Sequence, residues 1–154
     1  LVMEKNVLIK GDPELLKLGE NIVIQAGAIL HLGGQEWCRN CGSIEIGKGS
    51  VISPYCVIYG CGPGGVRIGK NFDCGPHVGI FASRSDYKKG PGNHVFGPVT
   101  IGDNVIVFAN CVIGPGVVIG DGATIAAGSI VSRDIPAHCL AAGNPAAVIM
   151  TDIR

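Results

Sequence analysis

The chain has 154 residues, the size of one domain, and its 12 basic and 12 acidic side chains give a formal net charge of zero. No basic cluster exceeds Lys88-Lys89, so neither nucleic acid nor an anionic membrane surface is expected as a partner. No apolar run approaches the ~18 residues of a membrane-spanning helix. The first residues lack the apolar stretch of a signal peptide, and we expect a cytoplasmic protein.

In chain order, the sequence predicts an N-terminal segment over residues 1–17, a repeat domain over 18–135 and a closing segment over 136–154. In the repeat domain an aliphatic residue recurs every six positions, in five groups of three. The groups are 18, 24 and 30; 46, 52 and 58; 68, 74 and 80; 101, 107 and 113; and 119, 125 and 131. Ten of these fifteen residues are isoleucine, and only Cys74 is not aliphatic.

A spacing of six fits neither a helix face of period 3.6 nor simple strand alternation. It fits a triangular coil of three six-residue sides, with the aliphatic side chain pointing inward. The residue four positions later is usually small, because a narrow prism leaves no room for two bulky inward residues. These positions are Ala28, Ser50, Cys56, Val78, Val105, Cys111, Val117, Ala123 and Ser129. The sequence therefore predicts an all-β solenoid of about five coils.

Insertions interrupt the repeat. The groups open at residues 18, 46, 68, 101 and 119, so successive openings are 28, 22, 33 and 18 residues apart. Subtracting one coil of 18 residues leaves excesses of 10, 4, 15 and 0 residues. The first insertion lies at about 33–43, the second at 60–65 and the third within 81–98, and the last interval has no insertion. Because insertions in a solenoid extrude as loops and often carry binding sites, the long loop at 81–98 is the first place to look for function.

Seven cysteines are present, and reduced thiols in a cytoplasmic protein are the simplest interpretation. Cys38-Arg39-Asn40-Cys41 has metal-ligand spacing, and with Cys61 and His31 it could form a zinc clip. A single Cys-x-x-Cys is a weak signal. We therefore favour ordinary loop cysteines and expect no structural zinc at Cys38 and Cys41.

The carboxyl-terminal third carries the most specific motifs. They are Gly97-Pro98-Val99-Thr100-Ile101-Gly102-Asp103-Asn104-Val105, Ala109-Asn110, Ile113-Gly114-Pro115-Gly116-Val117, Ala127-Gly128-Ser129-Ile130-Val131, Asp134-Ile135-Pro136 and Ala142-Gly143-Asn144-Pro145-Ala146. In this order they resemble the hexapeptide-repeat acyltransferases, in particular small sugar O- and N-acetyltransferases of the galactoside, maltose and capsule-polysaccharide types. The resemblance covers about residues 44–150. It implies a left-handed parallel β-helix, an exception to the right-handed crossover rule, and a homotrimer.

The resemblance also implies acetyl-CoA as co-substrate, bound in the groove between neighbouring prisms. Its pantetheine arm would run along the backbone near Ala109 and Ala127, where small residues allow close approach. Arg133 and Asn144-Pro145 would lie near the nucleotide end. Small residues at narrow corners are an equally good explanation of Ala127. Two departures weaken the match: Phe108 stands where the family usually has Gly, and Ala147 where it often has a basic residue.

Acyl transfer from a thioester to a hydroxyl needs a base. Galactoside-type relatives carry a histidine at the position that aligns with Ser85, and a serine hydroxyl cannot replace imidazole near neutral pH. We therefore favour His94, inside the long loop, as the base, with His77 as the second candidate. An N-acetyltransferase without a histidine base remains an alternative. His31 and His138 are expected to have structural, solvent or cofactor-proximal roles.

Arg84, Ser85, Asp86 and Tyr87 begin the long loop and are the candidate acceptor-binding residues. Carboxylate and guanidinium groups hydrogen bond sugar hydroxyls or phosphate, and Tyr87 offers a stacking face. A solvated charged loop is the alternative.

The sequence thus predicts direct transfer of an acetyl group from acetyl-CoA to a hydroxyl or amine of a sugar or nucleotide-sugar, as in polysaccharide biosynthesis. Two other functions stay open. A zinc enzyme resembling the γ-class carbonic anhydrases would use His77 and His94 as ligands, although the characteristic histidine spacing is absent. A non-catalytic trimeric scaffold would explain the departures at Ser85, Phe108 and Ala147.

Overall fold

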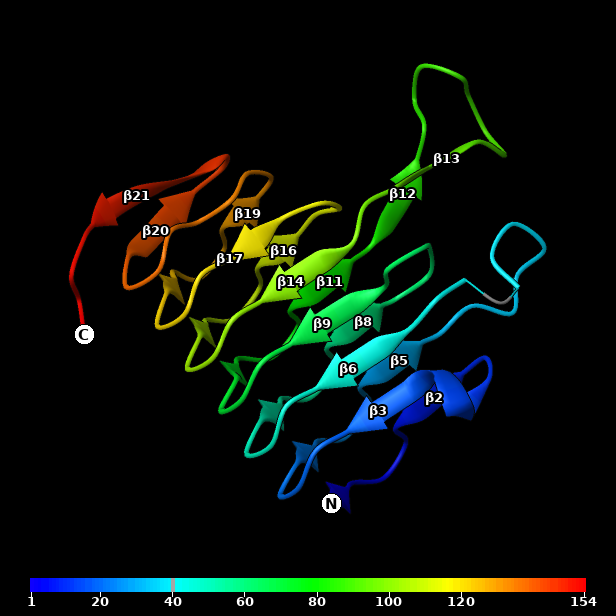
Figure 1. The fold of residues 1–154 in the computed structure, drawn as a ribbon, viewed down its shortest axis with the longest axis horizontal. Helices are drawn as coiled ribbons and strands as arrows, with labels where there is room; N and C mark the ends of the chain where they lie inside the picture. Colours follow the sequence, from blue (N-terminus) through cyan, green and yellow to red (C-terminus); the bar gives the residue numbers. More distant parts are fainter. Residues whose placement is uncertain (40) are drawn as a thin grey trace.

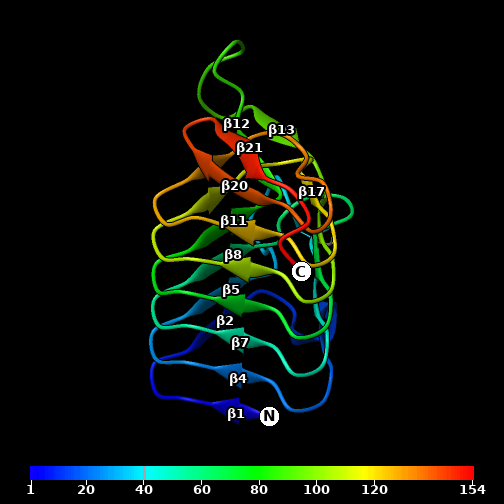
Figure 2. The same ribbon diagram turned by 90° about the vertical axis from the view of Figure 1, so that its left-hand side faces the viewer.

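A computed structural model describes residues 1–39 and 41–154, and over them the chain forms strands, one short 3-10 helix, η1 (Pro13–Leu15), and no α-helix. Three sheets of short parallel strands make the sides of a prism (Figures 1 and 2). Within the described residues, no helix has the length and apolarity needed to cross a membrane.

The three sheets take their strands in rotation along the chain. Sheet A contains β1 (Val2–Met3), β4 (Val23–Ile24), β7 (Val51–Ile52), β10 (Asp73–Cys74), β15 (Ile106–Val107), β18 (Thr124–Ile125) and β20 (Leu140–Gly143), and ends on the antiparallel strand β21 (Ala146–Met150). Sheet B contains β2 (Leu8–Lys10), β5 (Ile29–His31), β8 (Val57–Tyr59), β11 (Gly79–Phe81), β16 (Val112–Ile113) and β19 (Ile130–Val131). Sheet C contains β3 (Leu16–Leu18), β6 (Ile44–Ile46), β9 (Val66–Ile68), β14 (Val99–Ile101) and β17 (Val118–Ile119).

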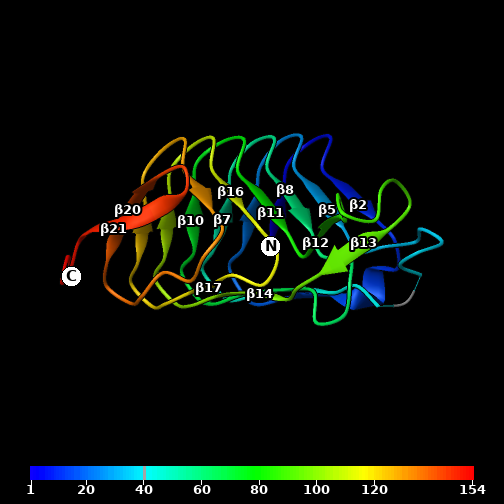
Figure 3. The ribbon, with the colours of Figure 1, turned by 90° about the horizontal axis from the view of Figure 1, so that it is seen from above.

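Each complete coil starts in sheet C and passes through sheets A and B, so the five strands of sheet C open the five predicted coils. The register keeps the aliphatic ladder aligned, since Ile46 pairs with Ile68 and Ile68 with Ile101. β1 and β2 pair with β4 and β5, so parallel stacking extends into residues 1–17. At the other end, β21 folds back on β20, as Figure 3 shows in red and orange. The predicted all-β parallel β-helix is confirmed.

The core is the predicted ladder. Fourteen of the fifteen inward positions are at most 2% exposed, and only Leu18, on the first complete coil, is partly buried. The nine small residues of the second inward row are also buried. Fully burying an aliphatic side chain stabilises a fold by about 1.5–3 kcal/mol, so the stacked isoleucines are the main source of stability.

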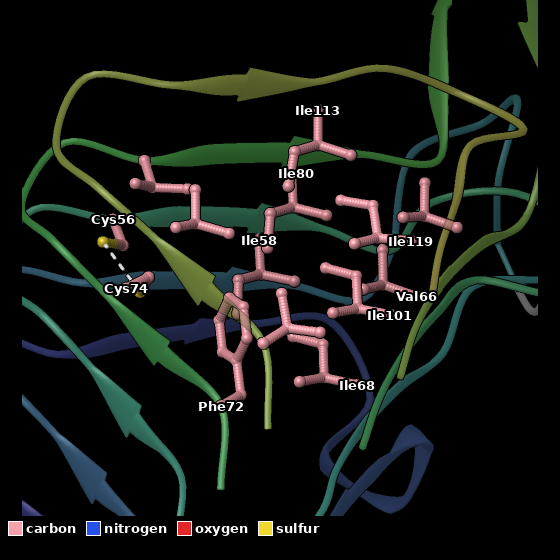
Figure 4. Close-up of a cluster of buried hydrophobic side chains, with 14 of the residues drawn as sticks. Cys56, Ile58, Val66, Ile68, Phe72, Cys74, Ile80, Ile101, Ile113 and Ile119 are labelled. Carbon is pink, nitrogen blue, oxygen red and sulfur yellow. Dashed lines mark hydrogen bonds between the residues drawn. The ribbon is translucent and has the colours of Figure 1, made fainter. Parts of the chain in front are cut away.

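The largest core residue departs from the predicted pattern. Phe72 lies four positions after Ile68, in the row of small inward residues, and is fully buried (Figure 4). Its neighbour in the preceding coil is Ser50, whose hydroxyl accepts a hydrogen bond from the Phe72 N–H at 3.1 Å. Cys56 and Cys74 contact each other nearby, with their sulfurs 3.7 Å apart. The small Ser50 side chain beside Phe72 offsets part of the ring's volume, because cores are packed to a constant density.

All three insertions leave the prism at the same edge. Residues 32–43 connect β5 to β6, residues 60–65 connect β8 to β9, and residues 82–98 connect β11 to β14. Each connection runs from sheet B to sheet C, and Figure 1 shows the three loops along one side of the molecule. Because neighbouring coils repeat about every 4.8 Å, these loops lie next to one another. We call this side the B–C edge and the side between sheets A and B the A–B edge.

The glycine corners between sheets C and A give a first test of the packing. A Cβ atom added at Gly47 would lie 2.5 Å from the Gly69 carbonyl carbon and 2.7 Å from the Lys70 nitrogen. We expect Gly47→Ala to lower the free energy of unfolding by about 1–3 kcal/mol through overpacking, measured by chemical denaturation. Gly114→Ala is the control, because its nearest neighbour, the Val131 oxygen, is 3.5 Å away. Equal losses in the two variants would contradict this account.

Candidate active site

The A–B edge is a row of corner residues with positive φ. His77, Asn110 and Gly128 occupy equivalent positions in successive coils, with φ of 59°, 61° and 73°. The backbone N–H of each donates to the coil before it, at 3.2 Å for His77 to Pro54, 3.1 Å for Asn110 and 2.9 Å for Gly128 to Ala109. The row is therefore a continuous hydrogen-bonded edge.

Four of the five predicted cofactor-binding residues lie along this edge. Ala109 and Ala127 immediately precede Asn110 and Gly128, and Asn144-Pro145 forms the turn between β20 and β21 one coil further on. The Gly143 N–H donates to the Ser129 hydroxyl at 3.1 Å, which ties that turn to the Ala127 corner. Arg133 follows β19 and is exposed at the B–C edge. The structure therefore separates Arg133 from the other four.

His77, the second candidate base, also lies on the A–B edge, one coil before Ala109. Its side chain is exposed, and its ring stacks on Tyr55, with centroids 5.5 Å apart and planes 11° apart. Phe108, the residue that departs from the family pattern, is 51% exposed beside Ala109. This edge therefore offers an imidazole and an apolar ring beside the small corner residues.

The acceptor-binding candidates lie in a β-hairpin that extends from the B–C edge. It pairs β12 (Ser83–Ser85) with β13 (His94–Phe96) and places Ser85 directly opposite His94. Asp86 closes the turn, because its carboxylate accepts from the Lys88 N–H at 3.0 Å and its own N–H donates to the Asn93 oxygen at 2.8 Å. The Asp86 carboxylate therefore already has a structural partner.

Arg84 and Tyr87 are free to meet a ligand at the hairpin. The Arg84 guanidinium carbon lies 5.5 Å from the centre of the Tyr87 ring, and Arg84 Nη1 donates to the Ser85 oxygen at 3.0 Å. Tyr87 is 77% exposed. The pair presents a cation and an aromatic face to solvent, a combination suited to sugar hydroxyls, a phosphate or a base.

His94 is held in place by a residue from another insertion. Its half-buried ring stacks on Trp37 of the 32–43 loop, with centroids 4.0 Å apart and planes 13° apart. Trp37 also lies near Phe96 and Tyr59, at 6.1 Å and 6.3 Å between centroids. Sequence reasoning missed Trp37, although the signal was present: it is the chain's only tryptophan and stands in an insertion.

The two candidate bases stand on opposite edges of sheet B. His77 precedes β11 and His94 belongs to the hairpin that follows it. One six-residue side of a coil spans about 20 Å at ~3.3 Å per residue, so a single chain does not bring these histidines together. Over residues 1–39 and 41–154 no pocket is present. The A–B and B–C edges of one chain thus form two separate exposed surfaces.

A second group of reactive side chains lies under the insertions. The Cys41 thiol donates to the Cys38 sulfur at 2.9 Å, and Cys61 Sγ lies 3.1 Å from His31 Nδ1. Gly33 lies between the two pairs, because its N–H donates to His31 Nδ1 at 3.1 Å and a Cβ atom added to it would lie 3.4 Å from Cys38 Sγ. Burial raises the pKa of the Cys61 thiol, whereas burial and the positive charge of Lys10 lower the pKa of His31. The four residues considered for a zinc clip are therefore neighbours.

Comparisons with known proteins agree with this architecture. The model for the bacterial transferase hexapeptide (six repeats) matches residues 90–133. Galactoside O-acetyltransferase of Escherichia coli is 42% identical over 88 residues, covering 54% of this chain and 43% of that enzyme. A solved structure of a variant of AntD, an N-acyltransferase from Bacillus cereus, in complex with dTDP-4-amino-4,6-dideoxyglucose and coenzyme A has a TM-score of 0.86 at 26% identity, covering 99% of this chain and 81% of that chain.

A hexapeptide-repeat acetyltransferase from Vibrio cholerae, solved with acetyl-CoA, has a TM-score of 0.76 at 25% identity, covering 90% of this chain and 73% of that chain. The chain spans less than half the length of the curated relatives it matches. The six-residue ladder, the family match and the structural similarity lead to one conclusion. The chain has the left-handed parallel β-helix fold of the hexapeptide-repeat acyltransferases, and it resembles them in sequence over its carboxyl-terminal part.

Proposed function

We propose that this chain is an acetyltransferase that moves an acetyl group from acetyl-CoA to a hydroxyl or amine of a sugar or nucleotide-sugar, as in polysaccharide biosynthesis. The alignment of Ala109, Ala127 and Asn144-Pro145 along one exposed edge carries the proposal. Small residues there let a thin pantetheine chain approach the backbone and hydrogen bond to it. The V. cholerae neighbour bound to acetyl-CoA and the AntD neighbour bound to a nucleotide-sugar and coenzyme A support this choice of ligands.

The proposed active unit is a homotrimer. Apolar side chains are exposed on the outer surface of the later coils: Phe108, Val112 at 37% and Val118 at 45%. Exposed apolar surface of this kind favours association. In a ring of prisms, the A–B edge of one chain would face the B–C edge of the next. The hairpin of one chain would then place His94 and the acceptor-binding residues beside the acetyl-CoA bound along the A–B edge of its neighbour. The seven free cysteines support a cytoplasmic location.

The chemistry is direct transfer. The acceptor oxygen or nitrogen attacks the thioester carbonyl carbon, and a backbone N–H stabilises the oxyanion. The carbon–sulfur bond then breaks, and the coenzyme A thiolate leaves and takes up a proton. His94 removes the acceptor proton in this scheme, with His77 as the alternative. Arg84, Ser85 and Tyr87 contact the acceptor, while Asp86 holds the turn of the hairpin.

Calorimetric titration with acetyl-CoA, followed by turnover on sugar and nucleotide-sugar acceptors, tests the proposal. Ala127→Leu should weaken acetyl-CoA binding at least about tenfold, because the side chain would occupy the path along the edge. Ala137→Leu is the matched control, since Ala137 is an exposed corner residue between sheets C and A. Absence of acetyl-CoA binding in the unaltered protein would favour the scaffold function instead.

A further inference from the structure

Two insertions and one strand end bring four metal-ligand side chains together at the B–C edge. Cys38 and Cys41 come from the loop at 32–43, Cys61 from the loop at 60–65, and His31 from the end of β5. The four residues form two close pairs, with the Cys41 and Cys38 sulfurs 2.9 Å apart and Cys61 Sγ 3.1 Å from His31 Nδ1. Gly33 lies between the pairs, because its N–H donates to His31 Nδ1 and a Cβ atom added to it would lie 3.4 Å from Cys38 Sγ. Residues up to 30 positions apart thus meet in one cluster.

The cluster is buried and its imidazole is oriented. His31, Cys38 and Cys61 are at most 7% exposed. The Gly33 N–H donates to His31 Nδ1 at 3.1 Å, so this nitrogen carries a lone pair and the ring proton lies on Nε2. The His31 ring packs on Tyr59, with centroids 4.4 Å apart, which fixes its plane. The lone pair that faces Cys61 is the one a metal would use, and metal binding would therefore replace the Gly33 hydrogen bond.

Contrary to the expectation from the sequence alone, we propose that Cys38, Cys41, Cys61 and His31 bind one structural Zn²⁺ ion. Three thiolates and one imidazole are a common tetrahedral set for structural zinc, and Cys-x-x-Cys is its usual spacing. Four protein ligands leave no open coordination position, which distinguishes such a site from a catalytic one. The proposal does not depend on the acyltransferase function.

Metal binding would require local adjustment of the two pairs and loss of the Gly33 hydrogen bond to His31. Among the described residues, no group of three or more His, Cys, Asp or Glu side chains already surrounds one metal position, because the four residues stand as two close pairs. With Zn–S of ~2.3 Å and Zn–N of ~2.0–2.1 Å, tetrahedral ligands lie about 3.8 Å apart for two sulfurs and about 3.6 Å for sulfur and nitrogen. The pairs at 2.9 Å and 3.1 Å would each open by less than about 1 Å. Side-chain rotation in a loop supplies this, and metal binding commonly organises its own site.

The clip would have a consequence for the rest of the B–C edge. Trp37 directly precedes Cys38 and stacks on His94 at 4.0 Å. Fixing Cys38 to Cys61 therefore fixes the tryptophan against the hairpin. A disulfide between Cys38 and Cys41 would use only two of the four residues and would leave Cys61 and His31 without a shared role.

Metal analysis of untagged protein, purified under reducing conditions, tests the proposal. We expect about one zinc per chain, retained against a chelator of micromolar affinity. Cys41→Ser and Cys61→Ser should each lower zinc retention at least about tenfold. Cys139→Ser is the matched control, because Cys139 is buried and lies outside the cluster. Far-UV circular dichroism confirms that each variant keeps its β-helix before metal is counted.

Cobalt substitution gives a second measurement that does not depend on enzyme activity. Co²⁺ in a tetrahedral thiolate site should give intense visible bands and a thiolate-to-metal charge-transfer band. The charge-transfer band should weaken in Cys41→Ser and stay unchanged in Cys139→Ser. Failure of reduced, zinc-reconstituted protein to retain metal would overturn the proposal. So would equal loss in Cys139→Ser, or a Cys38–Cys41 disulfide, seen as two thiols missing from the seven in denatured, unreduced protein.

Discussion

A His94→Ala variant should bind acetyl-CoA as the unaltered protein does and turn over about 10²–10⁴-fold more slowly. The reason is that the hydroxyl acceptor would lose the group that takes its proton. His94 is opposite Ser85 in the hairpin, and its ring is held flat against Trp37 at 4.0 Å. Steady-state kinetics with an O-acceptor, together with calorimetry for acetyl-CoA, separates the chemical step from binding.

Two variants distinguish a base from a packing residue at this position. His94→Phe keeps an aromatic ring against Trp37 but has no basic nitrogen, so it should be as slow as His94→Ala. Recovery of the rate in His94→Phe would mean that His94 only packs. His138→Ala, an exposed residue away from both edges of sheet B, should leave the rate unchanged. If His94→Ala retains full activity, His77→Ala becomes the decisive variant.

A Phe72→Ala variant should lose about 3–5 kcal/mol of the free energy of unfolding. Phe72 heads the largest fully buried side chains, and its neighbour in the preceding coil, Ser50, is small. Ser50 cannot expand into the vacated space, so a cavity would remain. Small domains have a total stability of about 5–15 kcal/mol, and this loss is a large part of it. Urea or thermal denaturation followed by circular dichroism measures it.

Phe108→Ala is the matched control for Phe72→Ala. It removes the same ring from a position that is 51% exposed, so its effect on unfolding should stay within about 0.5 kcal/mol. A small loss in Phe72→Ala would indicate that the prism collapses around the missing ring.

The fold could be predicted almost completely, because the repeat acts on every coil in the same way. An inward aliphatic residue every six positions has one packing solution that buries all of them, and positions such as Ile58, Ile80 and Ile113 stack as expected. Phe72 was not predicted in the core. Its place depends on the volumes of Ser50 and its other neighbours in space, and no local pattern records those volumes.

The candidate site was predicted less well, because its residues belong to different edges of the prism. The spacing did contain part of the answer, since every excess follows the third aliphatic residue of its group, here Leu30, Ile58 and Ile80. Three loops that leave successive stacked coils at the same corner are neighbours in space, so their side chains can be expected to contact one another. That argument would have brought Trp37 to His94, a contact that the search for motifs along the chain did not reveal.

The sequence by itself determined the prism, its number of complete coils, its core and the positions where loops leave it. These properties follow because the same six-residue pattern recurs in every coil. Only the tertiary structure decided which side chains are neighbours across loops. It separated Arg133 from Ala109 and Ala127, placed His77 and His94 on opposite edges, and brought Cys61 to His31 beside the Cys38–Cys41 pair. The physical reason is that the contacts of an insertion are set by the edge from which it leaves and by the loops above and below it, not by the residues adjacent to it in the chain.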